Sequence, residues 1–421
     1  MARYPSRYSA LSLLRKGATR SNWPRAWRDH DLKSSYDVVI VGGGLHGLAT
    51  AYYLAKNHGI TDVAVLDKGW IGGGNTGRNT TIVRSDYLIE ENSQFYDFSL
   101  GLWAGLSEEL NFNIMFSQRG TVTLAHSEGQ LNQLARLANA MLLRGIEAEL
   151  LTREEVLSEI PVLNGSRDTR WPIVGAFRQP NAGTARHDSI VWGYARAADS
   201  LGVDIIQGCE VTGMKIDKGR IRGVQTSRGT INANKVAMVV AGHTSPVAAM
   251  AGLKLPIETH MLQAMVSEPI KPVLDTVVMS MAFDGYVSQT NKGEILMGAE
   301  LDLYPSFSQR GNLPRIEEIA RYTLTLFPSF GRLRLMRTWA GVNDMTMDGS
   351  PLIGLTPIDG LYINGGWCYG GFKTIPGSGW AFADTLANER PNELIAPFAI
   401  DRFMTGRTIN ENGHGPMPQH H

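Results

Sequence analysis

A short apolar run that ends in closely spaced glycines constrains the fold more than any other feature of this sequence. Tyr36 to Val41 reads YDVVIV, and such a run rich in Val and Ile is typical of a fully buried parallel strand. Gly42, Gly44 and Gly47 follow with G-x-G-x-x-G spacing, and residues 48–56 then carry apolar side chains at helical spacing. The segment predicts a strand, a glycine turn and a helix in direct succession.

A second buried strand, residues 63–66 (VAVL), follows the expected helix and ends at Asp67. In such a unit Gly42 permits the tight turn, Gly44 lets backbone N–H groups approach a pyrophosphate, and Gly47 allows the helix to pack closely on the strand. The Asp67 carboxylate can accept hydrogen bonds from ribose hydroxyls. The segment therefore predicts a dinucleotide at the positive end of the helix.

The glycine spacing alone is a weak signal. The chain holds 46 glycines, so about half a G-x-G-x-x-G match is expected by chance. Two matches occur, at residues 42–47 and 72–77. Only the first follows a buried strand and opens a helix, so we assign nucleotide binding to the first.

Bulk composition narrows the function. At 421 residues the chain has room for two or three interleaved domains. Lys plus Arg equals Asp plus Glu, so we expect a small-molecule substrate and neither nucleic acid nor a membrane as partner. Cys209 and Cys368 stand far apart, which argues against a disulfide framework or a metal site and fits a reducing cytoplasm. No apolar run is long enough to cross a bilayer and no leader has a cleavage pattern, so we expect a soluble, cytoplasmic protein.

Later segments must complete the same sheet. Residues 236–240 and 361–364 are further short apolar runs that lead into glycines, and hairpin turns are expected at residues 218–219 and 228–229. We predict an α/β (α+β) fold in which a discontinuous Rossmann-like domain carries an inserted mixed or antiparallel-sheet substrate domain. The expected nucleotide-binding domain comprises residues 36–95, 165–255 and 335–400, and the substrate domain comprises residues 96–164 and 256–334.

The two ends of the chain differ from the rest. Residues 1–35 form a basic arm with only two acidic residues, and they read either as a leader or as an arm that docks on another subunit. Residues 401–421 form a polar C-terminal tail without a motif. The basic residues of the arm are Arg3, Arg7, Arg15, Lys16, Arg20, Arg25, Arg28 and Lys33.

A series of blocks near the C-terminus resembles the closing signature of the D-amino acid oxidase and sarcosine oxidase flavoprotein family. The resemblance implies that the nucleotide is FAD and that the late glycine loop, at Gly371, lines the flavin ring. It also implies FAD contacts at Lys68 and Val211. The blocks are residues 348–354, 361–362, 365–367, 370–373 and 376–379.

Within that family the chain is most similar to the β subunits of heterotetrameric sarcosine oxidases. Residues 36–56, 73–85 and 186–188 carry this closer resemblance. It implies α, γ and δ partner subunits and tetrahydrofolate used through the complex. Monomeric relatives tether FAD through a cysteine, and residues 339–347 contain none, so we expect non-covalent FAD.

His187 has two interpretations. From the residues alone it neighbours the N-cap of a helix that starts near Ser189. The resemblance implies instead that His187 carries covalent FMN, because an imidazole nitrogen can attack the activated methyl carbon of a flavin. Arg186 would then stabilise the anionic reduced ring, although the family often has Lys there. We assign no acid–base role to His46 of the glycine loop.

Two cations are expected at the substrate. The resemblance implies that Arg84 and Lys373 bind a substrate carboxylate and orient the amine toward the flavin. The alternatives are that Arg84 pairs with Asp86 or Glu90 and that Lys373 is a solvated loop lysine.

The expected reaction is the oxidation of a secondary amine, sarcosine or a similar N-methyl amino acid. Hydride passes to FAD and electrons pass to FMN and O2, which gives H2O2. A single-flavin amino acid dehydrogenase that reduces a quinone or carrier protein, and a subunit that catalyses nothing, are the alternatives.

Overall fold

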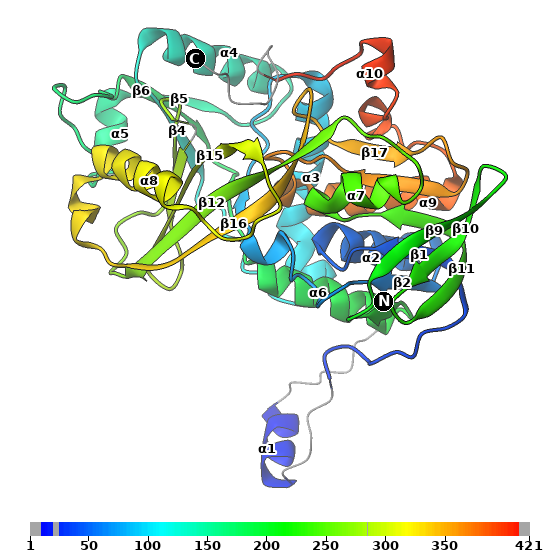
Figure 1. Cartoon of the computed structure of the whole chain (residues 1–421). Helices are drawn as coiled ribbons and strands as arrows, with labels where there is room; N and C mark the ends of the chain where they lie inside the picture. Colours follow the sequence, from blue (N-terminus) through cyan, green and yellow to red (C-terminus); the bar gives the residue numbers. More distant parts are fainter. Residues whose placement is uncertain (1–9, 20–24, 284, 412–421) are drawn as a thin grey trace.

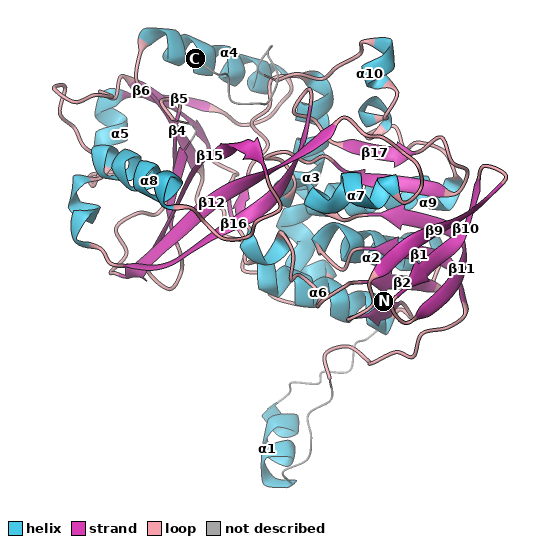
Figure 2. Ribbon diagram, viewed as in Figure 1, coloured by secondary structure: helices cyan, strands magenta, loops and turns pink. Residues whose placement is uncertain are grey.

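The computed structural model describes residues 10–19, 25–283 and 285–411 and contains two large sheets that lie side by side (Figure 1). Helices cover both sheets (Figure 2). The first sheet contains the predicted nucleotide unit, and the second is built from segments inserted between its strands.

The first sheet has β1 (Ser35–Val41) at its centre, between β11 (Gly229–Met238) and β2 (Val63–Leu66), and all three strands run parallel. Val39 lies in register with Val236 on one side and with Ala64 on the other. The last four residues of β1 are all buried, because helices cover one face of the sheet and a hairpin covers the other. The sheet continues beyond β2 through β8 (Asp204–Ile206), and beyond β11 through β18 (Leu361–Gly365) and the antiparallel β17 (Leu352–Leu355).

Four helices share one hydrophobic cluster with the first sheet. They are α2 (Leu45–His58), α3 (Glu90–Glu109), α6 (His187–Ser200) and α9 (Ile375–Asn388). On the opposite face, the hairpin of β9 (Val211–Asp217) and β10 (Arg220–Thr226) packs with α7 (Thr244–Ala249). The predicted turn at residues 218–219 is confirmed, since Lys218 and Gly219 both have positive φ angles.

The second sheet is mainly antiparallel; only β13 and β4 pair in parallel. In order across the sheet, its strands are β16 (Leu335–Thr346), β12 (Ile257–Pro269), β15 (Glu294–Pro305), β14 (Gly285–Gln289), β13 (Val277–Ser280), β4 (Thr121–Ala125), β6 (Gly175–Gln179) and β5 (Glu149–Thr152). It packs against α4 (Glu128–Leu143), α5 (Arg153–Glu159) and α8 (Leu313–Leu326).

Short elements connect these layers. They are η1 (Thr76–Arg78), β3 (Ile82–Val83), β7 (Gly183–Thr184), η2 (Ala241–His243), η3 (Pro328–Arg332), η4 (Phe372–Thr374), η5 (Ala396–Phe398) and α10 (Arg402–Thr405). At the N-terminal end, α1 (Ala10–Thr19) extends away from the body (Figure 1). Across the described part of the chain, each helix is too short or too polar to cross a bilayer.

The predicted fold class is confirmed, but strand pairing differs from the expected partition in two places. Residues 175–179 and 335–346 were expected in the nucleotide-binding domain, whereas β6 and β16 pair within the second sheet. β16 belongs to the second sheet because it is long: it pairs with β12 over eleven positions before the chain returns to the first sheet. Strand pairing alone does not delimit domains, so the domain boundaries stay a prediction. Residues 1–9, 20–24 and 412–421 of the arm and tail lie outside the described residues.

Candidate active site

The glycine loop leaves no room for side chains at Gly42 and Gly47. Gly42 has φ +113°, and a Cβ added there would lie 2.1 Å from the Val239 carbonyl oxygen. A Cβ at Gly47 would lie 2.1 Å from the Gly42 carbonyl oxygen. Gly44 is the N-cap of α2 and has no side chain to cap the first-turn amides. The loop therefore brings the end of β1 and the start of α2 into contact and presents a helix N-terminus to an anion.

Asp67 lies against this loop, directly after β2. Its Oδ2 accepts the Gly43 N–H at 2.9 Å, and its Oδ1 accepts the Gly69 N–H at 2.8 Å. Burial raises the pKa of the Asp67 carboxyl, while these two amide bonds oppose the shift. The acidic residue is thus fixed beside the glycine turn, where the sequence predicted a ribose contact.

The other two expected FAD contacts lie close to Asp67. Lys68 is exposed, and its Nζ lies 3.3 Å from Nε2 of His243. Val211 is buried at the start of β9, two residues after Cys209, whose N–H bonds to the Asp67 carbonyl. Their contacts with the cofactor stay a prediction.

His46 connects the glycine loop to the late glycine loop, residues 365–379. Its ring stacks on Trp367 with centroids 4.6 Å apart and planes at 18°. Its Nδ1 is hydrogen-bonded to Ser378 Oγ at 2.9 Å, and its Nε2 faces the backbone of Gly371. Burial lowers the pKa of His46 to about 4, so the ring is neutral at ordinary pH. This supports a positioning role and not a general-base role.

The polar contacts of His46 extend through the late loop. Ser378 Oγ also accepts a hydrogen bond from Asn364 Nδ2 at 2.8 Å, and Asn364 Oδ1 accepts the Trp367 indole N–H at 2.8 Å. These three residues come from β18, the loop after it and α9. The network therefore connects both ends of the late loop to His46 of the glycine loop.

Arg84 and Lys373 converge on one aromatic ring, although 289 positions separate them in the sequence. The Arg84 guanidinium carbon lies 5.6 Å from the centroid of Tyr87, and Lys373 Nζ lies 5.7 Å from it. Tyr87 in turn stacks on Tyr96 at 3.8 Å. A Cβ at Gly370 would lie 1.7 Å from the Tyr96 hydroxyl, so the late loop is in close contact with this aromatic pair.

The charges of the two cations are balanced differently. Arg84 Nη1 donates to Asp86, whose charge holds the pKa of Arg84 above its usual value despite the lowering effect of burial. This is the ion pair that the sequence left open. Lys373 is a buried residue and not a solvated one; its Nζ donates to Tyr87 Oη at 3.4 Å and to the Tyr369 carbonyl at 3.3 Å. Burial, and then the charge of Arg84, lower the pKa of Lys373 well below its usual range.

The position of the lysine is set by its backbone. The Lys373 carbonyl oxygen accepts hydrogen bonds from Ser99 Oγ at 2.9 Å and from the Trp103 indole N–H at 2.8 Å. Both donors lie on α3, which also carries Tyr96. An anionic group between Arg84 and Lys373 would therefore meet two cations that are each fixed by the protein.

His187 is the first residue of α6, two positions earlier than the sequence suggested. The residue is half-buried, and its Nδ1 is buried without a hydrogen-bond partner among the described residues. Burial lowers the pKa of the His187 imidazole. Arg186 makes a two-point ion pair with Asp188, at 2.8 and 3.2 Å, so its charge is balanced locally.

Two further arginines lie near His187, and the sequence reasoning did not select them. Arg337 on β16 stacks on Trp339, with 4.9 Å between guanidinium carbon and ring centroid, and Trp339 Nε1 donates to the Arg78 carbonyl at 2.7 Å. Neither Arg78 nor Arg337 has a carboxylate partner among the described residues. Burial, and then the charge of Arg337, lower the pKa of Arg78. Arg337 also lowers the pKa of His187. No local motif marks these residues, because β16 brings them together.

Asp344 is another buried group that the sequence did not reveal. Its Oδ2 accepts the Gly366 N–H, and its carbonyl oxygen accepts the Cys368 N–H at 3.0 Å. Burial raises the pKa of the carboxyl to about 6. Asp344 thus holds the late loop at Gly366 and Cys368.

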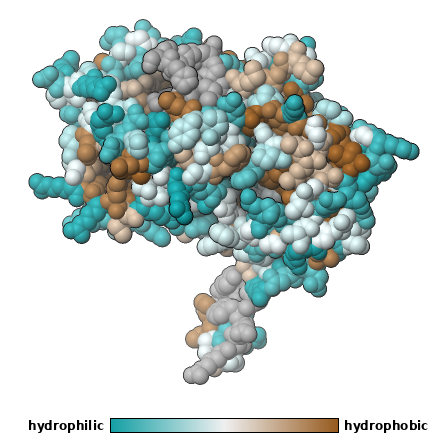
Figure 3. Space-filling view, viewed as in Figure 1, coloured by the Kyte–Doolittle hydropathy of each residue, from teal (hydrophilic) through white to brown (hydrophobic). Residues whose placement is uncertain are grey.

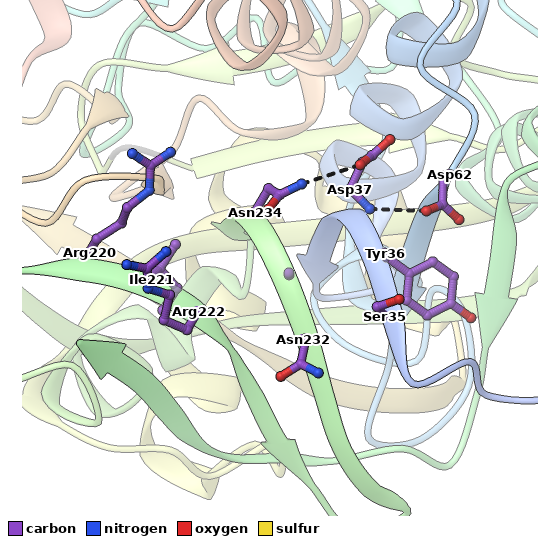
Figure 4. Close-up of a pocket in the computed structure, with 10 residues that line it drawn as sticks. Ser35, Tyr36, Asp37, Asp62, Arg220, Ile221, Arg222, Asn232 and Asn234 are labelled. Carbon is purple, nitrogen blue, oxygen red and sulfur yellow. Dashed lines mark hydrogen bonds between the residues drawn. The ribbon is translucent and has the colours of Figure 1, made fainter.

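A polar pocket of about 360 Å³ lies at the other end of β1 (Figure 4). Ser35, Asp37, Asp62 and Arg220 are among its lining residues. Because the glycine loop follows the last residue of β1 and this pocket surrounds the first ones, the pocket is separate from the nucleotide site. We assign it no role in the reaction.

Comparison with known proteins gives this geometry a family. Residues 37–385 match the family model described as FAD dependent oxidoreductase. The chain belongs to this family. The tight glycine turn and the fixed Asp67 carboxylate fit FAD at that loop, as the sequence predicted.

The relatives narrow the class of enzyme. The chain is 53% identical over 416 residues to the sarcosine oxidase subunit beta of Rhizobium meliloti (strain 1021), a match that covers 99% of this chain and 100% of that protein. It is 52% identical to the subunit of the same name from Arthrobacter sp, over 92% of this chain and 96% of that one. The prediction of a flavin-dependent amine oxidoreductase is confirmed at this level.

Solved structures share the fold. The L-proline dehydrogenase from P. horikoshii superposes with a TM-score of 0.84 and 28% identity, over 90% of this chain and 100% of that one. The glycine oxidase from Geobacillus kaustophilus has a TM-score of 0.79 at 24% identity, over 88% and 99% of the two chains.

Proposed function

We propose that this chain oxidises a secondary amine that carries a carboxylate, sarcosine or a similar N-methyl amino acid, as the β subunit of a heterotetrameric oxidase with α, γ and δ partners. The observation that carries the proposal is the convergence of Arg84 and Lys373 on Tyr87, beside the late loop. The names of the R. meliloti and Arthrobacter relatives support the substrate class. Two buried, unpaired cysteines agree with a cytoplasmic location.

The residues of the chain have distinct tasks in this proposal. Arg84 and Lys373 bind the substrate carboxylate, which fixes the N-methyl C–H toward the flavin. Tyr87 and Tyr96 form an aromatic wall that excludes water, and His46 holds the late loop in place. Non-covalent FAD, when bound, accepts a hydride equivalent from the methyl carbon. Gly371 would then line its ring.

The overall reaction balances with oxygen as acceptor. Sarcosine, water and O2 give glycine, formaldehyde and H2O2; when tetrahydrofolate takes the one-carbon unit through the complex, formaldehyde is not released. In this proposal FMN is covalently bound to His187 and is the second electron carrier. A half-buried histidine with an unpartnered Nδ1, and the two unneutralised arginines nearby, fit an anionic flavin at this position.

The FMN assignment is tested by counting flavins in the purified complex. Acid precipitation should leave one flavin bound to the polypeptide and release the other. His187→Ala should abolish the covalent fraction and retain FAD, whereas His58→Ala, at the end of α2, should change neither. Release of all flavin from the wild-type protein would exclude covalent FMN.

The substrate is tested by mixing the enzyme anaerobically with sarcosine, dimethylglycine, N-methylglutamate and proline. Bleaching of FAD by an N-methyl amino acid, fastest with sarcosine, is the expected result. If none of these amines reduces FAD, the proposed function is wrong.

A single-flavin dehydrogenase is the second candidate. It is favoured by the TM-score of 0.84 to a protein named L-proline dehydrogenase. In that case the complex would hold one flavin, proline would be the best reductant, and a quinone or carrier protein would accept the electrons.

A further inference from the structure

The N-terminal arm consists of a tightly held segment and a helix that projects from the body (Figure 1). Residues 25–34 run along the first sheet, where Trp27 packs against the main hydrophobic cluster. Helix α1 precedes them and contains no buried residue. Residues 20–24 between the two lie outside the described residues.

The held segment is fastened by buried carboxylates of the body. The two ring nitrogens of His30 each lie 2.9 Å from a carboxylate oxygen, one of Asp199 and one of Asp204, and all three side chains are at most 9% exposed. Arg28 donates to Asp199 through both its backbone N–H and its guanidinium. Lys33 Nζ lies 3.1 Å from Asp204. The arm therefore leaves the body at a fixed point.

Helix α1 is amphipathic and carries its apolar side chains in water. Leu11, Leu13 and Leu14 are 80%, 50% and 73% exposed, and Figure 3 shows hydrophobic surface on the projecting arm. Helical spacing puts these leucines on one side and Arg15 and Lys16 on the other. A ten-residue helix is marginal in water unless its apolar face is packed. The leucines therefore need an apolar surface to pack against.

The arm accompanies relatives that are named as subunits. The match to the FAD-dependent oxidoreductase family begins at residue 37, so the arm lies outside the catalytic fold. The R. meliloti subunit nevertheless matches 416 of the 421 residues, which includes nearly all of the arm. The arm is thus present in a relative that is named as a subunit.

We propose that the arm is a subunit-docking element: residues 25–34 anchor it on the first sheet, and α1 inserts its leucine face into an apolar groove of another subunit of the oxidase. The groove should have an acidic rim, since Arg15 and Lys16 flank the leucine face. This inference rests on the proposed heterotetramer. It adds to that proposal the segment through which this chain binds another subunit.

The test is assembly with the α, γ and δ subunits of the same organism, co-produced with the full-length chain and purified through a tag on the α subunit. The variant Leu11→Asp/Leu14→Asp should weaken retention of this chain at least tenfold on dilution, measured by native mass spectrometry. Its FAD content and thermal midpoint should equal those of the wild type, because α1 buries nothing against the body. Leu143→Asp, at a leucine that is 89% exposed on α4, is the matched control and should assemble normally.

The outcomes separate the two proposals. If the wild-type chain assembles and the double variant assembles as tightly, the arm proposal is overturned and the proposed function stands. If no form of the chain assembles, the heterotetramer itself is overturned, together with the arm proposal. Leucine-dependent flotation with phosphatidylglycerol vesicles, or a leucine-dependent homodimer, with assembly unchanged in the double variant, would assign the helix to a membrane or to a second copy and overturn docking to a subunit.

Discussion

His46 shows how a residue in a nucleotide loop can act without acid–base chemistry. It stacks on Trp367 and is hydrogen-bonded to Ser378, so it joins two loops that are about 320 positions apart. A single neutral ring supplies both contacts. The sequence placed His46 in the loop but gave no sign of its partners, because both lie at the other end of the chain.

The first prediction concerns the pH dependence that His46 imposes on stability. Its folded pKa of about 4 lies below the unfolded value, so the unfolded chain binds a proton first as the pH falls. The free energy of unfolding should therefore decrease by about 3 kcal/mol between pH 6.5 and pH 4 because of this residue. His46→Asn should remove that part of the pH dependence in urea unfolding. Equal pH slopes in both proteins would contradict the assignment.

The second prediction concerns Lys373. Burial and Arg84 lower its pKa, and a bound carboxylate favours its protonated form. The affinity for sarcosine or an acidic inhibitor should fall as the pH rises through the pKa of Lys373, which lies well below the usual lysine value. Lys373→Met should raise KM about ten- to hundredfold, which corresponds to the loss of one charged hydrogen bond, and should abolish this pH dependence.

Lys56→Met is the matched control for Lys373, since Lys56 is a partly exposed lysine near the C-terminal end of α2 that pairs with Glu109 of α3. It should leave KM and its pH profile unchanged. A pH-independent KM in the wild-type enzyme would show that Lys373 does not titrate on substrate binding.

At the residue scale, the sequence predicted what depends on near neighbours. The roles of Gly42 and Gly47 follow from spacing, and the pairing of Arg84 with Asp86 was an open alternative because two positions separate them. Arg337 and Tyr87 were not predicted. Arg337 influences His187 from β16, a strand of the second sheet that lies 150 positions further along the sequence. Tyr87 becomes a site residue only when the late loop packs against it.

At the scale of elements, the crossing of α2 and α9 determines how the two glycine loops meet. A Cβ added to Gly379 would lie 2.5 Å from the Ala49 Cβ and 3.1 Å from the Thr50 nitrogen. The helices therefore pack with almost no separation at this point. Any side chain there must push the late loop away from the glycine loop.

The third prediction follows from this contact. Gly379→Ala should destabilise the protein by about 1–3 kcal/mol through overpacking, and it should weaken FAD retention because the loop at Gly371 moves with α9. Gly101→Ala on α3 is the control: a Cβ there meets nothing within 4 Å, so a gain of about 0.4–1 kcal/mol is expected. Thermal unfolding and FAD content after gel filtration measure both effects. Unchanged FAD retention in Gly379→Ala would disprove the coupling.

The C-terminal tail also acts at this scale. The Glu411 carboxylate accepts hydrogen bonds from the N–H groups of Leu88 and Ile89 and from Asn92 Nδ2, so it caps the N-terminal end of α3. No function was expected for this tail from the sequence. A cap supplied from over 300 positions away has no local signature, unlike the Thr152 and Glu155 capping box of α5.

At the scale of the whole molecule, the sequence predicted the first sheet and not the second. The runs at residues 36–41, 63–66 and 236–240 are apolar except for Asp37 and lead into glycines or Asp67, which identifies parallel strands buried on both faces. The second sheet contains strands of mixed burial, such as β16, whose first four residues are exposed, with long excursions between its strands. Its pairing depends on contacts between distant segments, so its strands could not be placed in register.

Asp348 and Arg402 join the end of the chain to the first sheet. Arg402 donates to both carboxylate oxygens of Asp348 at 2.8 Å, and the Ile409 N–H donates to the same carboxylate at 2.9 Å. Each side chain is 2% exposed. Burial alone would raise the pKa of Asp348, but Arg402 outweighs burial and lowers it.

The fourth prediction follows from this buried pair. Because the folded pKa of Asp348 lies below its unfolded value, its stabilising contribution is present above about pH 4 and is lost as the pH falls through the folded pKa. Arg402→Met leaves a buried charge without its partner and should cost about 3–5 kcal/mol at pH 7. Asp348→Asn/Arg402→Met should recover part of this loss, since no uncompensated charge remains.

Arg222→Met is the control. It removes an exposed pair with Asp217 and should cost less than about 1 kcal/mol. Urea unfolding at pH 7 and pH 3.5 measures each value, and equal losses in Arg402→Met and Arg222→Met would show that the C-terminal attachment does not depend on this pair.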